Sequence, residues 1–452
     1  MRNNDKWIIL IFALVLILFA VFSTKTTFHD SAEFITIAKY FAGIDNVDLF
    51  SAHSLVYPVI ISLFLKIWPS EIMFRLVNVM WVFLIGMILF FWLNNKKVFL
   101  LFAFSPLVWQ TSIQTTPVLP ATFFFLLSFI FFKKDEIKYN LVYSGLFLGF
   151  TFAIYTPMIL VAGSFIIVYF WGRSFKEFFI YILALGIGLL PGIALDYYLF
   201  HQPFYSFIRY LGANVLVSLG VRVSTDFQIF KRGFFILSLL FIISPFLFKI
   251  YKLDFKKYSK EIIFIILVAL LFVVRIAELK YFIILTPVIL LLLSKCLSEK
   301  EIKLNAIISI FIIIYLIWGF FGANQEILIT KDLKSITNDF KVDYILTETH
   351  QAINFARYQW ENEPRFIWFQ DYEASINNIT TTKSYTIGIN PKIPLRENLN
   401  ILFNFDRPSN KSYDGSIIFV VRKDRQEFVN EQEVLAEFKL NKCYEVLCVY
   451  SK

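Results

Sequence analysis

Two carboxylates and a histidine follow the first hydrophobic segment of this chain. The segment runs from Trp7 to Ser23, and His29, Asp30 and Glu33 come shortly after it. Ionisable groups at a membrane boundary are costly to bury, so they are functional candidates by default. A carboxylate there can take the proton of an acceptor hydroxyl as that hydroxyl attacks the anomeric carbon of a sugar. Asp30 is therefore a candidate general base, and Glu33 a candidate second catalytic acidic residue.

The spacing of these two carboxylates has a second explanation. Residues three apart share one face of a helix. Asp30 as N-cap with Glu33 three positions later would form a capping box. The two explanations are compatible, because a cap would also fix the geometry of a site.

Two histidines are candidates for orienting the acceptor. These are His29 and His53, although a lone loop histidine is often only a solvated polar residue. Neither belongs to an HxxE or HExxH pattern, so the sequence indicates no zinc site. A divalent metal ion as cofactor is compatible with the sequence but is not indicated by it.

A second charged stretch lies in a short turn between two later hydrophobic segments. Residues 275–281 read R-I-A-E-L-K-Y. Cations at a membrane surface suit a lipid phosphate, which must be held and then leave as an anion. The alternative is that the cations snorkel and anchor helix ends. Lys280 and Arg275 are therefore candidates for binding a donor phosphate, and Tyr281 is a candidate for orienting the acceptor.

Arg222, in the loop 200–231, is a further candidate for binding the phosphate. The alternative explanation for Arg222 is a charged side chain that is simply solvated in the loop.

The composition requires lipid as the solvent for most of the chain. Of the 452 residues, 58% are hydrophobic and 17% are charged, and phenylalanine alone supplies 55. A soluble domain of this length would not hide so much apolar surface. The net charge of +9 comes mostly from short loops, which indicates membrane orientation and no nucleic-acid partner.

The three cysteines are too few for a disulfide framework. In a single strand, Cys443 and Cys448 would point to opposite faces. We expect all three cysteines to be structural.

Apolar runs long enough to cross a membrane predict about 11 transmembrane helices. Their approximate ranges are 7–23, 74–93, 98–113, 117–132, 140–155, 157–171, 177–199, 232–250, 261–276, 279–297 and 303–321. Lysine and arginine gather in alternate loops, which places the N-terminus in the cytoplasm and the C-terminus outside.

Polarity rises abruptly after Gly322 and suggests two domains. We expect an all-α polytopic membrane domain over 1–323 and an extracytoplasmic soluble α/β domain over 324–452. The tail contains a helix-like run, Gln351–Trp360. Its strand-like runs are Tyr344–Thr347, Phe366–Phe369, Ile417–Val421 and Tyr444–Tyr450.

Four stretches resemble the GT-C superfamily, whose members are multi-spanning glycosyltransferases that use polyprenyl-phosphate-linked sugars. Residues 30–38 (D-S-A-E-F-I-T-I-A) resemble the first-loop motif D-E-x-x-Y-x-x-x-A, with Ser31 in place of Glu. Residues 278–282 with Pro287 are similar to an E-x-R-Y turn, with Lys280 in place of Arg, which keeps the charge but loses the bidentate fork. The other two stretches are residues 105–125, and residues 145–149 continuing through 188–191 to 200–204.

This resemblance covers about residues 7–321 and implies a function. It implies an inverting glycosyltransferase that moves a sugar from a dolichyl or undecaprenyl phosphate to a protein, lipid or glycan acceptor outside the membrane. By family role Asp30 is the base, and Lys280 and Arg275 contact the donor phosphate. The motif W-W-D-x-G is absent, which argues against the oligosaccharyltransferase branch.

Two other functions remain as alternatives. A lipid-linked sugar flippase or transporter predicts charges at mid-membrane depth and inverted repeats, whereas the charges here cluster on one side. A non-catalytic scaffold with a partner-binding tail predicts that Asp30 is dispensable.

Overall fold

The computed structural model describes most of the chain. Its described residues are 3–23, 29–44, 53–112, 114–134, 136, 138–210, 241–275, 279–321, 324–347, 365–369, 372 and 413–452. Contacts divide the chain into two compact units, of which the first holds residues 1–23, 52–57 and 75–321, and the second holds 24–51, 58–74 and 322–452. The sequence placed a single boundary at 323, and its assignment of a transmembrane and a soluble domain stays a prediction.

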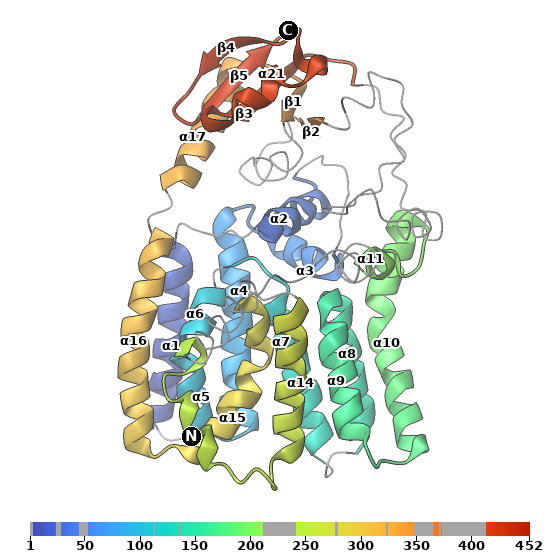
Figure 1. The fold of residues 1–452 in the computed structure, drawn as a ribbon, viewed down its shortest axis with the longest axis vertical. Coiled ribbons are helices and arrows are strands. Elements are labelled where there is room, and N and C mark those ends of the chain that lie inside the picture. Colours follow the sequence, from blue (N-terminus) through green and yellow to red (C-terminus); the bar gives the residue numbers. More distant parts are fainter. Residues whose placement is uncertain are drawn as a thin grey trace. The chain divides into compact units, whose positions relative to one another are not determined.

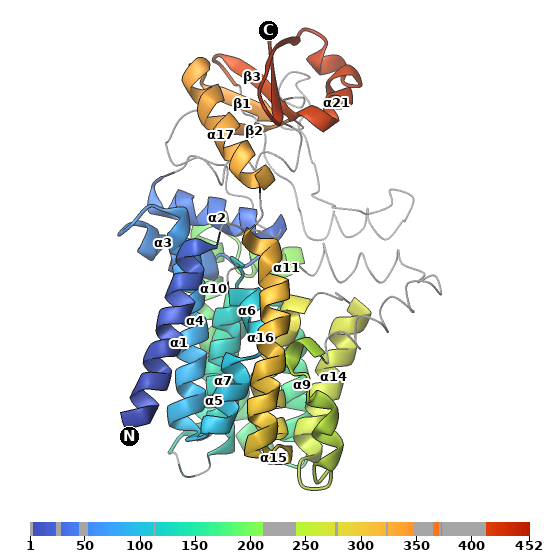
Figure 2. The same ribbon diagram turned by 90° about the vertical axis from the view of Figure 1, so that its left-hand side faces the viewer.

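The first unit is a bundle of helices that lie side by side (Figures 1 and 2). Its longer α-helices are α1 (Asn3–Phe22), α4 (Glu71–Met87), α7 (Val118–Lys133), α8 (Asn140–Ile154), α9 (Ile159–Phe170), α10 (Phe175–Phe200), α14 (Ser259–Arg275), α15 (Thr286–Cys296) and α16 (Glu299–Phe321). Shorter elements are the π-helical η1 (Ile88–Trp92), α5 (Lys96–Ala103), α6 (Pro106–Ser112), α11 (Tyr205–Tyr210) and the 3-10 helices η2 (Thr156–Met158), η4 (Leu247–Lys252) and η5 (Leu279–Ile284).

These helices follow most of the predicted spans. Within the described residues, Glu71–Trp92 and Phe175–Leu199 are long and apolar enough to cross a membrane, judged by length and composition alone. Shorter apolar helices cover several other spans. The fold is therefore that expected for a polytopic membrane protein, while the number of crossings stays a prediction.

Several predicted spans are not continuous α-helices, and in three of them the helix breaks near a proline. The span 98–113 divides before Pro106, and the span 279–297 begins as η5 and continues as α15 with Pro287 near its start. In the span 232–250, helix ends at residue 243, before Pro245, and residues 232–240 lie outside the described residues. Proline lacks the N–H that a continuing helix needs, and its ring clashes with the preceding turn.

Glycines let α8 and α10 pack backbone to backbone. A Cβ added at Gly145 would lie 2.6 Å from the carbonyl oxygen of Tyr181. A Cβ added at Gly149 would lie closer than this to the carbonyl oxygen of Leu185, and one added at Gly188 would lie closer than this to the carbonyl oxygen of Leu146. Small residues of this kind allow close approach between membrane helices.

The basic turns gather at one end of this bundle. The starts of α5, α10 and α16 and the ends of α7, α9 and α15 lie at this lower end (Figure 1). A capping box joins Ser174 and Glu177 at the start of α10. Glu301 in the first turn of α16 accepts a hydrogen bond from Lys249, which lowers the pKa of Glu301 to about 2. The upper end, where α8, α10 and α14 finish, is the end that carries Lys280.

The second unit contains two helices before the tail and an α/β fold within it. The helices are α2 (His29–Ala42) and most of α3 (Val56–Leu65). The tail contains α17 (Asn324–Asp339), β1 (Tyr344–Thr347), β2 (Arg365–Trp368), β3 (Ile417–Arg422), η6 (Lys423–Arg425), α21 (Glu427–Asn430), η7 (Glu433–Leu435), β4 (Lys439–Cys443) and β5 (Leu447–Ser451). The strand order is β2-β1-β3-β5-β4. Strands β2, β1 and β3 are parallel, whereas β5 is antiparallel to β3 and β4.

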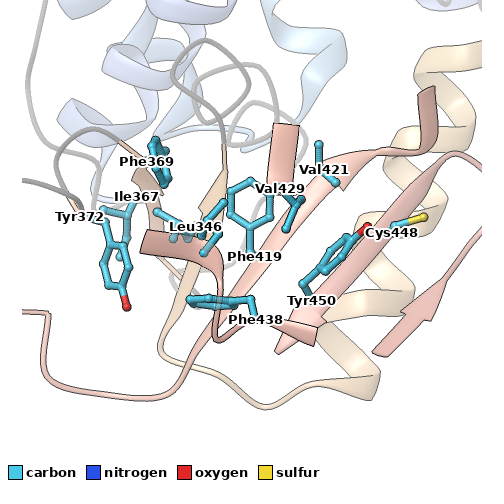
Figure 3. Packing of buried hydrophobic residues seen from close by; sticks show 11 residues of the cluster. Leu346, Ile367, Phe369, Tyr372, Phe419, Val421, Val429, Phe438, Cys448 and Tyr450 are labelled. Atoms are coloured by element: carbon cyan, nitrogen blue, oxygen red, sulfur yellow. The ribbon is translucent and has the colours of Figure 1, made fainter. Parts of the chain in front are cut away.

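Alternate residues of this sheet enter two apolar cores. On one face Ile345, Ile418 and Val449 pack with Leu333 and Ile336 of α17. On the other face, strand residues form a second cluster with apolar side chains of the segment 429–438, as Figure 3 shows. This cluster includes Leu346, Ile367, Phe369, Tyr372, Phe419, Val421, Val429, Leu435, Phe438, Cys448 and Tyr450. Burial on both faces explains the continuous apolar runs of β3 and β5.

The structure corrects two expectations about the tail. Cys443 and Cys448 form a disulfide, although we expected them on opposite faces of one strand. The expectation was wrong because the two cysteines lie on separate antiparallel strands and face each other in register. Helix α17 was not anticipated, and the predicted helix Gln351–Trp360 lies outside the described residues.

Candidate functional site at the upper end of the bundle

The first acidic motif lies at the start of α2, in the second unit. The helix begins at His29, so Asp30 is its second residue and not the N-cap that precedes it. The side chains of His29 and Asp30 lie outside the described residues. Glu33 is half-buried on the same helix. The assignment of these residues to catalysis stays a prediction.

The same helix carries a residue that the sequence analysis missed. Lys39 is fully buried, although it lies in the last turn of α2. Its signal in the sequence was a lone lysine between Ala38 and Tyr40, beside an otherwise apolar run. A lysine is almost never fully buried without a partner, so the burial of Lys39 indicates that its charge is paired within the fold.

The second charged motif forms a compact cluster in the first unit. Lys280 is 7% exposed, and its Nζ lies 5.5 Å from the centre of the Tyr281 ring. The Tyr155 hydroxyl donates a hydrogen bond of 2.7 Å to the Tyr281 hydroxyl, and the two rings are stacked. The imidazole ring of His53 stacks on the ring of Tyr155, with 6.5 Å between the two ring centres. We call these four residues the Lys280 cluster.

The predicted residues His53, Lys280 and Tyr281 thus come together, and Tyr155 joins them. Sequence reasoning missed Tyr155 because its partner Tyr281 is 126 positions away. An ammonium group, hydroxyls and an imidazole all donate hydrogen bonds, so the cluster suits an anion bearing several oxygens. Arg275 is the last residue of α14, with its side chain outside the described residues, and Arg222 lies wholly outside them.

Buried polar side chains hold the segment that begins at His53. Tyr57 donates a hydrogen bond of 2.9 Å to Oδ1 of Asn78, and Asn78 donates in turn to the carbonyl oxygen of Gln114. Burial raises the pKa of Tyr57 well above its ordinary value, so its hydroxyl keeps the proton that it donates. These bonds join α3, α4 and the connection between α6 and α7, and they support the position of His53.

The described residues contain no group of three histidine, cysteine, aspartate or glutamate side chains arranged to hold a metal ion.

Comparison with solved structures identifies the class of fold. The crystal structure of ArnT from Cupriavidus metallidurans bound to undecaprenyl phosphate matches with a TM-score of 0.66 and 10% identity, covering 100% of this chain and 98% of that chain. The apo structure of the same enzyme matches with a TM-score of 0.62, the same identity and the same coverage. ArnT is a GT-C glycosyltransferase, so the resemblance that the sequence motifs indicated over residues 7–321 is confirmed at the level of the fold. The structural match extends beyond these residues to the whole chain.

No family model matches this sequence, and no curated protein matches it.

Proposed function

We propose that this protein is a membrane glycosyltransferase that transfers a sugar from a polyprenyl-phosphate donor to an acceptor on the extracytoplasmic face. The observation that carries the proposal is the full-length GT-C fold, shared with an enzyme crystallised with undecaprenyl phosphate. Undecaprenyl phosphate is accordingly the lipid that we expect as the carrier. Membrane lipids surround the bundle, and the acceptor is a protein, a lipid or a glycan.

The proposed chemistry is a single displacement with inversion. A hydroxyl oxygen of the acceptor attacks the anomeric carbon of the sugar, and the bond from that carbon to the phosphate oxygen breaks. The electron pair of that bond leaves with the phosphate, and the hydroxyl proton passes to Asp30 as general base. Negative charge develops on the departing phosphate in the transition state, and its stabilisation by the protein is expected to contribute more to the rate than the proton transfer does.

The Lys280 cluster supports the departure of the phosphate in this reaction. A buried ammonium group interacts more strongly with a phosphate than an exposed one, because less water screens the charges. The Tyr281 hydroxyl beside Lys280 adds a hydrogen-bond donor for a second phosphate oxygen, because the hydrogen bond that it accepts from Tyr155 leaves its own proton available. In this proposal Lys280 binds the phosphate, with Arg275 and Arg222 as further cations, and His29 and His53 orient the acceptor. Tyr281, which the sequence assigned to orienting the acceptor, is proposed to bind the phosphate instead, because its ring lies beside the Lys280 ammonium group.

The decisive experiment measures sugar transfer in native membranes supplied with labelled polyprenyl-phosphate sugars. We expect transfer by the wild-type protein from one donor of the panel, and a loss of at least about 100-fold for Asp30→Asn. The isosteric amide keeps the shape of Asp30 and removes its basicity. Immunoblotting of the membranes controls for expression of the variant.

Two outcomes would contradict the proposal. Equal transfer by wild type and Asp30→Asn would remove Asp30 from the mechanism. If no donor supported transfer, even with total membrane extract added as a source of acceptor, the transferase assignment would be wrong and the flippase alternative would gain weight.

A further inference from the structure

A small cavity lies at the upper end of the first unit, between the end of α8 and the end of α10. Its volume is about 40 Å³. Polar lining comes from Asp196, Ser206, Ser54 and Thr156, while Phe152, Leu189, Ile193 and Phe207 supply part of the apolar wall. A space of this size holds a few water-sized groups but no sugar ring. We call it the Asp196 pocket.

Asp196 is a carboxylate with acceptor capacity to spare. It is 5% exposed, and its two oxygens accept hydrogen bonds from the hydroxyl of Ser206 at 2.6 Å and the backbone N–H of Ser206 at 2.9 Å. Within the described part of the chain, these donors all belong to one serine. An ionised carboxylate has about four acceptor positions, so two remain for a ligand. A buried carboxylate that is only partly satisfied is costly, which favours a functional role.

The turn that supplies Ser206 adopts an unusual backbone. His201 ends α10 with φ of +54°, and Phe204 has φ of +63°. Bulky residues seldom adopt this left-handed region, and such strain persists only where the surrounding structure maintains it. The turn reverses the chain so that Ser206 reaches Asp196, and Phe204 itself lines the pocket.

The pocket and the Lys280 cluster share two segments of the chain. Ser54 and Thr156 line the pocket, while the residues just before them, His53 and Tyr155, belong to the cluster. A donor phosphate at the cluster would therefore hold its attached sugar within reach of the pocket. The apolar wall and the single carboxylate fit one hydroxyl-bearing substituent, because sugar hydroxyls donate hydrogen bonds to carboxylates.

We propose that the Asp196 pocket binds one hydroxyl substituent of the donor's sugar and so selects which sugar is transferred. This inference rests on the proposed glycosyltransferase function. Asp196 would accept the hydroxyl proton in a hydrogen bond, without transferring it. Asp196 is then a specificity residue, whereas the Lys280 cluster recognises the phosphate that all such donors have in common.

The test compares the preferred donor with a set of its mono-deoxy analogues, each lacking one sugar hydroxyl. For one position, we expect the full-length wild-type protein to lose about tenfold or more in kcat/KM when the hydroxyl is absent. Asp196→Asn should lower kcat/KM for the complete donor and reduce that discrimination to near unity. Inhibition by undecaprenyl phosphate, which carries no sugar, should be unchanged in Asp196→Asn.

A second variant keeps the test decisive if Asp196→Asn fails to accumulate. Gly192 lines the pocket, and a Cβ there would meet only ordinary contacts, 3.5 Å from Cβ of Ala153. Gly192→Ala should therefore fold, fill part of the cavity and raise the KM of the complete donor. Gly186→Ala on the same helix α10 is the matched control, since a Cβ there meets nothing within 4 Å.

The outcomes separate this inference from the function on which it rests. Transfer that continues with wild-type discrimination at every position, in both Asp196→Asn and Gly192→Ala, would overturn the sugar pocket and leave the transferase intact. Weaker inhibition by undecaprenyl phosphate in Asp196→Asn would also overturn it, because the residue would then serve the phosphate or the fold. A wild-type protein that uses no donor would overturn both proposals.

Discussion

At the scale of single residues, the charge of Lys280 is the feature most open to test. Lys280→Met keeps much of the side-chain volume and removes the ammonium group, so we expect kcat/KM for the donor to fall by roughly 10- to 100-fold. Lys280→Arg should retain more activity, because it restores a cation that forms hydrogen bonds with phosphate. Steady-state transfer in purified membranes measures both variants.

Lys295 provides the matched control for this prediction. It is exposed in the last turn of α15, at the lower end of the bundle. Lys295→Met should leave the kinetics unchanged. If Lys280→Met also behaved like wild type, Lys280 would be an anchoring lysine, which is the alternative that its position near a helix end suggested.

At the scale of elements, the close contact between α8 and α10 makes a prediction about stability. A Cβ at Gly188 would lie 2.9 Å from Cα of Gly149 and from the backbone nitrogen of Phe150. Gly188→Ala must therefore push the helices apart, at a cost of about 1–3 kcal/mol. We expect its midpoint of thermal inactivation to fall by several degrees. Gly186→Ala, two residues away in open space, should match or exceed the wild type, since alanine favours helix.

The tail makes a separate prediction about acid stability. Asp339 at the end of α17 accepts hydrogen bonds of 2.6 Å from Lys442 and from the hydroxyl of Tyr444. These bonds lower the pKa of the Asp339 carboxyl. A lowered pKa in the folded state contributes stability at pH values above the ordinary carboxyl pKa, and this contribution is lost as the pH falls through the lowered value.

Pulse proteolysis of the full chain between pH 3 and pH 7 measures this effect. We expect the tail of the wild type to resist cleavage near neutral pH and to lose resistance below about pH 4. Asp339→Asn should start from a lower resistance at pH 7 and change less on acidification. Parallel pH profiles for the two proteins would show that Asp339 does not contribute in this way.

At the scale of the whole molecule, the cysteines offer a test of orientation. The Cys443–Cys448 disulfide favours an oxidising compartment for the tail. Cys296, in contrast, ends α15 at the lower end and is a free thiol. With the N-terminus in the cytoplasm, an impermeant maleimide applied to intact cells should label the tail only after an impermeant reductant. Cys296 should react only after the membrane is permeabilised.

The variant Cys296→Ser identifies which signal belongs to the tail. Labelling of Cys443 and Cys448 that needed permeabilisation, or that needed no reductant, would contradict the predicted orientation or the disulfide.

Local patterns allowed much of the architecture to be predicted. The apolar composition indicated lipid as solvent, and short apolar runs predicted the positions of β1, β2 and β3. The fourth predicted strand, 444–450, includes most of β5 together with the turn before it, and β4 was not predicted. These features depend on residues within one short window, where side-chain type and spacing act directly on the backbone. The sequence also singled out His53, Lys280 and Tyr281, because charged and polar groups next to apolar spans are visible without a fold.

Tertiary structure decided what these residues meet. Tyr155 contacts Tyr281 across 126 positions, and Cys443 reaches Cys448 because β4 and β5 pair in register. Asp196 accepts hydrogen bonds from Ser206 only because a strained turn reverses the chain. None of these partners follows from spacing, since each requires segments to be brought together by helix packing or strand pairing. The sequence by itself determined which residues are suited to chemistry, and the packing of the bundle and the sheet decided which of them act together.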